Sequence, residues 1–433
     1  MITFVYESFN ESLNTSNPNN WPKDWIIDGV ETKPYAWSDN NKEFQFDALH
    51  KLLFLDNTTL QSKIAKSTYI YNIYKLYDKL LSDEKYFYPI FISNVDYFPL
   101  MNSKNFSFNF IDERIINDVK NNRAKIIFLF LYEGFHSIYT KDQSRDDFII
   151  LDNWCKQFNF TKDQIYIATG NFLGPEQTKN LNFTALISNE LILWNKPNLN
   201  YKLKYNPSNE NYLYLSYNRR PRLHRTLLLC ELIRNNLLDY GKVSYYGGWS
   251  ERSVSGVIRY RSDLSDAANI LDQKKPLLLD IEDLKNNNPT GIKTIEHYEQ
   301  TFVSIVTETI YSENCLFLTE KIWKTLAIGH PFFLLGSKNL LKKLKELGFK
   351  TFDKWFNEDY DNYDKLDDRV SAIVNEIKRL SEFPIGKLKD IRLEMNSTIE
   401  YNKYKHFSLY RKTLDPIDEF GLLGQLNNIW KNF

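Results

Sequence analysis

The residues best suited to chemistry lie in the stretch TFVSIVTETIYSENCLFLTEKIWKTLAIGHPFFLLGS, residues 301–337. Within it the acid Glu308 follows an apolar, β-branched run that predicts a buried strand. Thr319, Glu320 and Lys321 then open a helical pattern that a glycine and a proline end. A helix N-terminus offers backbone amides to an anion and Lys321 adds an ammonium, so these residue types indicate a phosphate site. The alternative is that Thr319 and Glu320 only cap the helix.

A second group of polar residues follows the apolar run NYLYLSYN at 211–218. It gathers arginines and a histidine around the predicted start of a helix: Arg219, Arg220, Arg222, His224 and Arg225. Arginine forks match phosphate oxygens, and a strand-to-helix turn adds backbone donors, so a diphosphate suits this group. A solvated basic turn is the alternative. The balanced charge of the rest of the chain favours the binding site.

These residues stand where predicted strands end and helices begin. In the first half of the chain the pattern predicts strands at 86–93, 124–132 and 164–169, with helices at 113–122 and 146–158. In the second half it predicts strands at 211–218, 241–248, 302–306 and 331–335, with helices at 223–235 and 319–328. Such alternation is typical of parallel α/β domains, which bind ligands outside the carboxyl ends of their strands. We therefore expect Glu308 and Thr319 to Lys321 to converge on one crevice.

The Asn- and Pro-rich segment 195–211 predicts a linker between two domains. Residues 1–200 are expected to form an N-terminal, acceptor-side α/β domain whose first 84 or so residues are irregular. Residues 206–385 are expected to form a C-terminal α/β domain that binds a nucleotide sugar, and 386–433 to form helices that pack back on the N-terminal domain. Further helices are predicted at 46–53, 70–81, 339–347, 365–379 and 384–394.

Composition narrows the classes of function. Lys and Arg together number 55 in the 433 residues, as do Asp and Glu, so no net charge draws the whole chain to nucleic acid or to an anionic membrane. The three cysteines are widely separated and without CxxC spacing, which argues against a disulfide framework and a zinc site. The start lacks the pattern of a secretory signal, and no apolar run approaches the ~20 residues of a membrane span. These features predict a cytoplasmic protein.

Motifs for other chemistries are missing from the sequence. Asp359 and Asp361 have DxD spacing, but they lie in an acidic stretch that predicts an exposed loop, so a cation site is not expected there. There is no HExxH, GxGxxG or Walker sequence, which counts against a zinc protease, a dehydrogenase and a P-loop enzyme. There is also no GxSxG elbow, so a hydrolase triad has no anchor. We expect no metal and no cofactor beyond a nucleotide-sugar substrate.

The stretch SIVTETIYSENCLFLTEKIWKTLAIGHPFFLLGS resembles the donor site of the α-1,3-fucosyltransferase type of glycosyltransferase. In that family an acidic strand end is followed by Thr-Glu-Lys and then by a Gly-x-Pro strand. SYNRRPRLHRTLLLCEL also resembles the family's preceding element, in which an arginine touches the diphosphate; Arg225 matches it best. The family usually has Asn after the strand-end Glu and Tyr three places before the Glu of Thr-Glu-Lys, where this chain has Thr309 and Phe317.

The resemblance implies a GT-B-like fold, with two Rossmann-like α/β domains whose parallel sheets face a central cleft. It implies a nucleoside-diphosphate sugar as donor, with a GDP-sugar favoured, and a glycan or glycoconjugate as acceptor. Lys321 and Arg225 would neutralise the diphosphate, Glu320 would bind ribose hydroxyls, and Glu308 would face the donor sugar or the crevice. Arg219, Arg222, His224 and Thr319 complete the expected donor site.

An inverting, metal-independent sugar transfer needs a carboxylate to take the proton of the acceptor hydroxyl. Glu133 is the best placed acid, because it ends a predicted buried strand and Gly134 allows close approach. It could instead cap the next helix or pair with a neighbour. Two other functions stay open: a viral-type glycosyltransferase that acts on modified bases in nucleic acid, and a non-catalytic module that only binds a nucleotide sugar.

Overall fold

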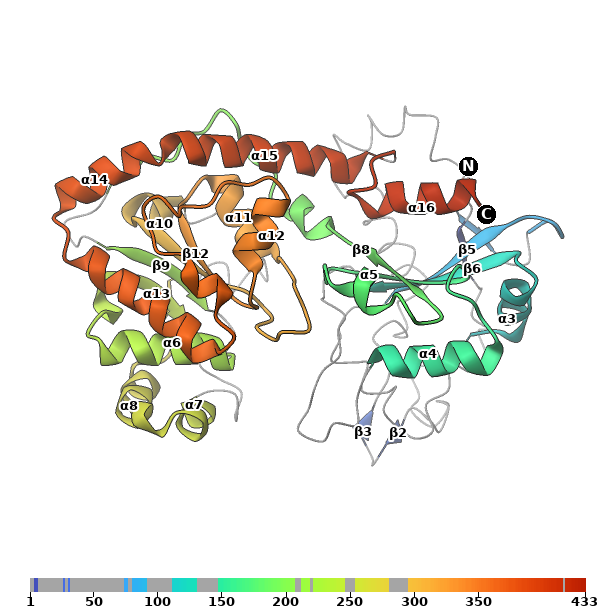
Figure 1. Cartoon of the computed structure of the whole chain (residues 1–433), viewed down its shortest axis with the longest axis horizontal. Coiled ribbons are helices and arrows are strands. Elements are labelled where there is room, and N and C mark those ends of the chain that lie inside the picture. Colours follow the sequence, from blue (N-terminus) through green and yellow to red (C-terminus); the bar gives the residue numbers. More distant parts are fainter. Residues whose placement is uncertain are drawn as a thin grey trace. The chain divides into compact units, whose positions relative to one another are not determined.

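The computed structural model describes residues 4–6, 26–27, 30–31, 74–76, 80–91, 111–130, 147–206, 212–218, 221–245, 254–279, 295–415 and 417–433. The chain divides into two compact units (Figure 1). Unit 1 contains Met1–Glu190 and Lys412–Phe433, and unit 2 contains Leu191–Arg411. The sequence pattern had placed the linker at 195–211, a few residues beyond this division.

Unit 1 is built on a six-stranded sheet with the order β4-β1-β5-β6-β7-β8, in which neighbouring strands pair in parallel. Its strands are β1 (Phe4–Tyr6), β4 (Tyr74–Leu76), β5 (Tyr86–Phe91), β6 (Ala124–Phe130), β7 (Ile165–Thr169) and β8 (Thr184–Ile187). Its helices are α3 (Glu113–Lys120), α4 (Asp147–Phe158), α5 (Gly174–Gln177) and α16 (Leu422–Lys431). The 3-10 turn η6 (Glu190–Trp194) begins at the last residue of unit 1 and continues into unit 2. A short antiparallel pair, β2 (Ile26–Ile27) and β3 (Val30–Glu31), lies outside the sheet.

The core of unit 1 follows from its apolar strands. Every residue of β6 is buried, as expected for a central strand with helices on both faces. Trp154 of α4 packs edge-on against Phe128 of β6, with ring centroids 6.1 Å apart. At the end of the chain, α16 belongs to this unit: Leu422 N donates to Glu190 Oε1 at 3.0 Å, and Trp430 packs on Phe87.

The predicted helix at 70–81 is wrong where the structure describes it, because residues 74–76 form strand β4. This strand pairs with β1 near the start of the chain, and such long-range pairing overrides the local helical pattern. Strand β1 likewise gives structure to a segment predicted as irregular. The predicted helix at 46–53 and the candidate base Glu133 lie outside the described residues.

Unit 2 contains a four-stranded sheet with the order β10-β9-β11-β12, again with every pair parallel. The strands are β9 (Tyr214–Asn218), β10 (Gly241–Tyr245), β11 (Val303–Thr307) and β12 (Phe332–Leu335). The helices are α6 (Leu223–Arg234), α7 (Val254–Tyr260), α8 (Ser265–Lys274), α10 (Ile295–Gln300), α11 (Glu320–Ile328), α12 (Leu340–Glu346), α13 (Leu366–Ser381), α14 (Ile385–Glu394) and α15 (Asn396–Leu414). Short 3-10 turns η7 (Leu238–Tyr240), η9 (Ser262–Leu264) and η10 (Asp359–Asn362) connect some of them. Two units with parallel sheets confirm the predicted α/β class.

The predicted exposure of the Asp359 to Asp361 segment is wrong for Asp361. Its side chain is buried and accepts hydrogen bonds from the backbone amides of Leu341 at 2.9 Å and Lys342 at 3.0 Å. The carboxylate therefore satisfies amides of the first turn of α12, which lack partners within the helix. Spacing alone could not reveal this, because the helix that needs the carboxylate precedes it in the chain.

Candidate functional site

The candidate site lies at the carboxyl ends of β9 and β11, where the order of the unit 2 sheet reverses. From β9 the chain passes through α6 to β10 on one side, and from β11 it passes through α11 to β12 on the other. Right-handed crossovers in opposite directions place α6 and α11 on opposite faces of the sheet. The ends of β9 and β11 are then not covered by one connecting helix, and open α/β sheets bind their ligands at such a switch point.

Asn218 joins the two strand ends at this switch point. It is fully buried, and its Oδ1 accepts a 2.6 Å hydrogen bond from Oγ1 of Thr307, the last residue of β11. Its Nδ2 donates to Ser216 Oγ at 2.8 Å, and its backbone N donates to Ser244 Oγ at 3.2 Å. Asn218 therefore fixes the ends of β9, β10 and β11 to one another.

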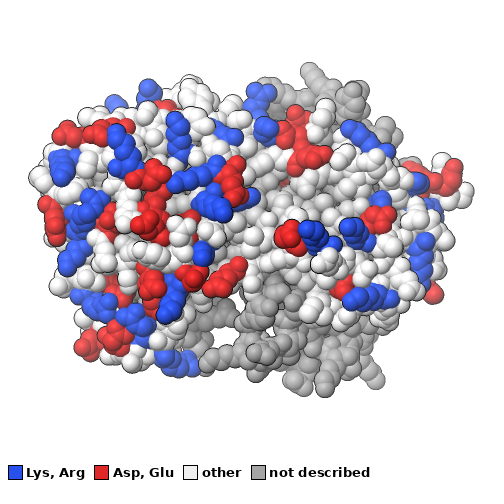
Figure 2. All heavy atoms as spheres, in the orientation of Figure 1, with Lys and Arg blue, Asp and Glu red and all other residues white. Residues whose placement is uncertain are grey.

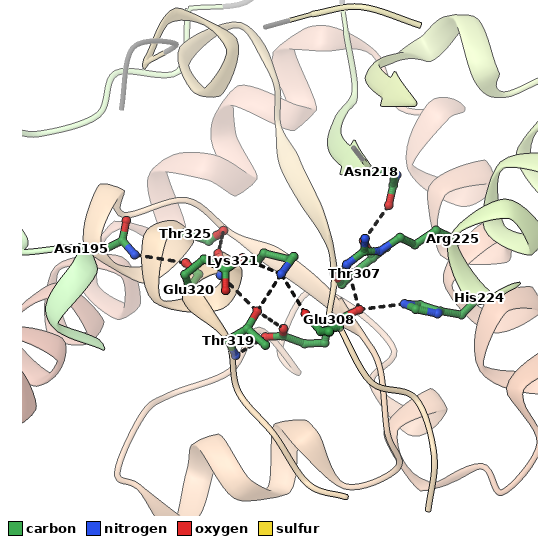
Figure 3. Close-up of polar contacts among 11 residues, drawn as sticks. Asn195, Asn218, His224, Arg225, Thr307, Glu308, Thr319, Glu320, Lys321 and Thr325 are labelled. Atoms are coloured by element: carbon green, nitrogen blue, oxygen red, sulfur yellow. Dashed lines mark hydrogen bonds and ion pairs between the residues drawn. The ribbon is translucent and has the colours of Figure 1, made fainter. Parts of the chain in front are cut away.

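Glu308 follows β11 directly and turns its carboxylate toward the start of α11 (Figure 3). Its Oε1 accepts a 3.0 Å hydrogen bond from Thr319 N, and its Oε2 accepts one from Thr319 Oγ1. The side chain is fully buried, and burial raises its pKa against the opposing influence of Lys321 and Thr319. Gly336, after β12, permits this packing, because a Cβ there would lie 3.0 Å from Glu308 Cβ. As the structure stands, Glu308 holds the N-terminus of α11.

His224 and Arg225, on the first turn of α6, hold the backbone at the same strand end. His224 Nε2 lies 2.8 Å from Glu308 O, and Arg225 Nη2 donates to the carbonyl oxygens of Thr307 and Glu308, each at 3.2 Å. Both side chains are buried. Burial, followed by the charge of Arg225, lowers the pKa of His224 well below its ordinary value, so the imidazole is neutral at pH 7.

The N-terminus of α11 carries the partly exposed charges of the site. Thr319 is the N-cap, and its Oγ1 accepts from Lys321 N at 3.4 Å. Glu320 and Lys321 form an ion pair at 2.6 Å, with side-chain exposures of 21% and 26%. Burial would raise the pKa of Glu320, but the Lys321 ammonium and its hydrogen bond outweigh that effect, and the pKa is lowered. Figure 3 shows Lys321 Nζ directed toward Glu320 and Thr319.

Asn195 is a member of this cluster that the sequence pattern did not single out. It follows η6, is 1% exposed, and donates from Nδ2 to Glu320 O at 3.3 Å. Among the described residues its Oδ1 has no hydrogen-bond partner. A lone Asn in an Asn- and Pro-rich segment gives no local signal of such a contact, so only the tertiary structure reveals it.

The structure brings most of the sequence-predicted donor residues together at one edge of the unit 2 sheet: His224, Arg225, Glu308, Thr319, Glu320 and Lys321. Arg222 is the N-cap residue of α6. Arg219 lies outside the described residues, as does Glu133. Within the described residues no group of three or more His, Cys, Asp or Glu side chains could hold a metal ion, and no helix is both long and apolar enough to cross a membrane.

Comparisons with known proteins assign the chain to no family. No family model matches it, and no curated protein is significantly similar to it in sequence, so the resemblance to the fucosyltransferase type receives no support from them. The crystal structure of the DNA-modifying enzyme β-glucosyltransferase, determined in the presence and absence of uridine diphosphoglucose, has 10% sequence identity and a TM-score of 0.32. That similarity covers 79% of this chain and 86% of that chain. A similarity this weak does not establish a function for this chain.

Proposed function

We propose that the chain is a glycosyltransferase that transfers a sugar from a nucleoside-diphosphate donor bound by unit 2. The observation that carries the proposal is the position of Lys321. Its ammonium lies at the N-terminus of α11, beside the switch point of a parallel sheet, and is partly exposed. Helix amides, a helix dipole and an ammonium there favour a phosphate group.

The buried residues of the site act, in this proposal, as the support of that phosphate group. Arg225 donates to backbone carbonyls at the end of β11 and is 4% exposed, so we assign it to positioning and not to direct contact with the diphosphate. Glu308 and Thr319 fix the first turn of α11 in the same way. Arg219 and Arg220, which follow β9 directly in the sequence, remain candidates for additional phosphate contacts.

The proposed chemistry is transfer with the diphosphate as leaving group. Its negative charge grows as the bond to the sugar breaks, and Lys321 with the α11 amides would stabilise that charge. The acceptor oxygen forms the new bond to the same sugar carbon, and its hydroxyl proton passes to a base, for which Glu133 of unit 1 is our candidate. We propose that unit 1 binds the acceptor and unit 2 binds the donor, as in a GT-B-like enzyme.

Two classes of acceptor are to be distinguished by experiment. The sequence resemblance implies a glycan or glycoconjugate, and the alternative is a modified base in DNA; the enzyme named above is DNA-modifying. Figure 2 shows Lys and Arg interspersed with Asp and Glu over the described residues of the visible face. DNA binding would make activity fall steeply with salt, whereas transfer to a neutral glycan would not.

The first experiment is a thermal-shift panel of UDP, GDP, CDP, ADP and TDP with their common sugars. A ligand at a hundredfold excess over Kd stabilises the fold by about 2.7 kcal/mol, which such a panel detects. Lys321→Ala should abolish the shift. Lys378→Ala should retain the shift, because Lys378 is exposed on α13 and lies far from the site. Arg369 of the same helix contacts Tyr311, in the loop between β11 and α11, and Lys378 lies about 13 Å further along the helix.

The outcomes separate the functional classes. A shift with one donor, followed by its hydrolysis or by transfer to either acceptor, supports a glycosyltransferase. A shift without hydrolysis or transfer to any glycan or modified DNA would support the non-catalytic binding module. If no nucleotide or nucleotide sugar stabilises the full chain, the proposed function is wrong.

A further inference from the structure

The ammonium of Lys321 has no hydrogen to spare in this structure. Its Nζ donates to Thr309 Oγ1 at 3.1 Å, to Thr319 Oγ1 at 3.1 Å and to Glu320 Oε1 at 2.6 Å. An ammonium has three N–H donors and no acceptor, so these contacts use all of them. A phosphate oxygen can reach Lys321 directly only if one of the three acceptors leaves.

Glu320 is the acceptor that an arriving phosphate would repel, because it is the only negatively charged one of the three. Its carboxylate is partly exposed and pairs with the Lys321 side chain. The other two acceptors are neutral hydroxyls, which do not repel an anion. That of Thr319 is buried and donates to Glu308, and that of Thr309 lies in the loop between β11 and α11. Glu308 is fully buried and has two bonds to Thr319, so it cannot exchange places with a ligand in the same way.

The position of Glu320 is also the one that an anion would prefer. Glu320 is the first residue of α11, where the amides and the helix dipole favour negative charge. Its carboxylate neutralises Lys321, but it also lies near the carboxylate of Glu308, and the two carboxylates repel each other. A phosphate group would satisfy the same ammonium and the same helix end.

We propose that Glu320 is an internal competitor of the bound diphosphate. In the ligand-free protein its carboxylate occupies the third hydrogen of Lys321, and the diphosphate binds by displacing it. This inference rests on the proposed function only in taking Lys321 as the phosphate ligand. Glu320 thereby becomes a specificity-determining residue, because a weakly charged anion cannot replace the carboxylate while a diphosphate can.

The test uses inorganic pyrophosphate and the full chain, with Kd measured by isothermal titration calorimetry. Glu320→Gln should bind pyrophosphate about two- to fivefold more tightly, the effect of removing a partly exposed ion pair of 0.5 to 1 kcal/mol. Pyrophosphate has no ribose, so the ribose contact that the sequence resemblance implies for Glu320 does not enter. Glu320→Ala is a second variant with the same expected direction.

Glu313→Gln is the matched control. Glu313 is exposed in the loop between β11 and α11, so its substitution removes one negative charge near the site without touching Lys321. The inference requires a larger gain for Glu320→Gln than for Glu313→Gln. Equal gains, or a Glu320→Gln protein that binds pyrophosphate no more tightly than wild type, would overturn it. Absence of pyrophosphate binding in all of these proteins would also overturn it, whereas only the nucleotide panel tests the proposed function.

Discussion

Glu308 is the residue whose removal tests most directly how the site is held together. In Glu308→Ala, Thr319 N and Thr319 Oγ1 lose their buried acceptor. Two hydrogen bonds to a charged acceptor contribute about 3 to 6 kcal/mol together, and removing the buried carboxylate recovers about 1 to 2 kcal/mol of its desolvation. The expected loss in the free energy of unfolding is therefore about 2 to 4 kcal/mol.

Urea unfolding followed by circular dichroism measures this loss, with Glu313→Ala as the exposed control in the same loop. Glu308→Gln keeps the size of the side chain and one strong acceptor, so it should lose about 1 kcal/mol. If Glu308→Ala unfolds within 0.5 kcal/mol of the wild type, the carboxylate does not hold α11 and this reasoning is refuted.

The pH dependence of stability in the wild type and in Glu308→Gln gives a second test. Burial raises the pKa of Glu308 above its ordinary value in the folded state. The folded protein therefore holds this proton more tightly than the unfolded chain, and the stability linked to it is fully present below the unfolded pKa. It is lost as pH rises through the folded pKa. Relative to Glu308→Gln, the wild type should become less stable as pH rises above about 4.5; a difference that is constant with pH would contradict the assigned pKa direction.

Three further predictions concern the surroundings of the site. His406 stacks on Trp323 of α11 with ring centroids 5.8 Å apart, and neither of its ring nitrogens has a hydrogen-bond partner among the described residues. His406→Phe should therefore raise the free energy of unfolding in urea by about 1 kcal/mol at pH 7, and by more at pH 5. The reason for the pH effect is that burial lowers the pKa of His406 to about 3, so stability is lost as pH falls below the unfolded value near 6.5. Gly329→Ala should lower the melting temperature and cost about 1 to 2 kcal/mol, because φ is +84° and the new Cβ would lie 2.8 Å from a side-chain carbon of Lys403. Asp361→Ala should cost about 1 to 2 kcal/mol in the same assay through loss of its bonds to α12 amides, while exposed Asp359→Ala should stay within 0.5 kcal/mol of wild type.

The sequence predicted those elements whose hydrophobic pattern is strong and local. Strands β6, β11 and β12 are rich in apolar residues and every residue in them is buried, and the start of α11 is marked by its N-cap Thr319. Strand β4 is three residues long and depends on β1, far away in the chain, so its local helical pattern was misleading. The burial of Asp361 could not be predicted for a similar reason, because its hydrogen-bond partners lie on α12, about 20 residues earlier in the chain.

The site was predictable as a set of positions but not as a set of side-chain directions. Parallel strands end at one edge of a sheet, so Glu308 and Thr319 to Lys321 could be expected near one another. Whether a charged side chain faces solvent depends on the helices packed around it. Arg225 and His224 show this, because α6 is buried along most of its length and directs both side chains to backbone carbonyls of β11.

The contacts at this edge separate stability from ligand affinity. Glu308, His224 and Arg225 are buried and form hydrogen bonds with Thr319 or with backbone carbonyls, so changing them removes interactions of the folded core. Glu320 and Lys321 are partly exposed and pair with each other, an interaction of small net energy. A change in that pair therefore leaves the fold almost as stable while altering the charge presented to a phosphate. Thr319 connects the two groups, because its hydroxyl donates to Glu308 and accepts from Lys321, and through it the rigid part of the site fixes where the exchangeable part can bind.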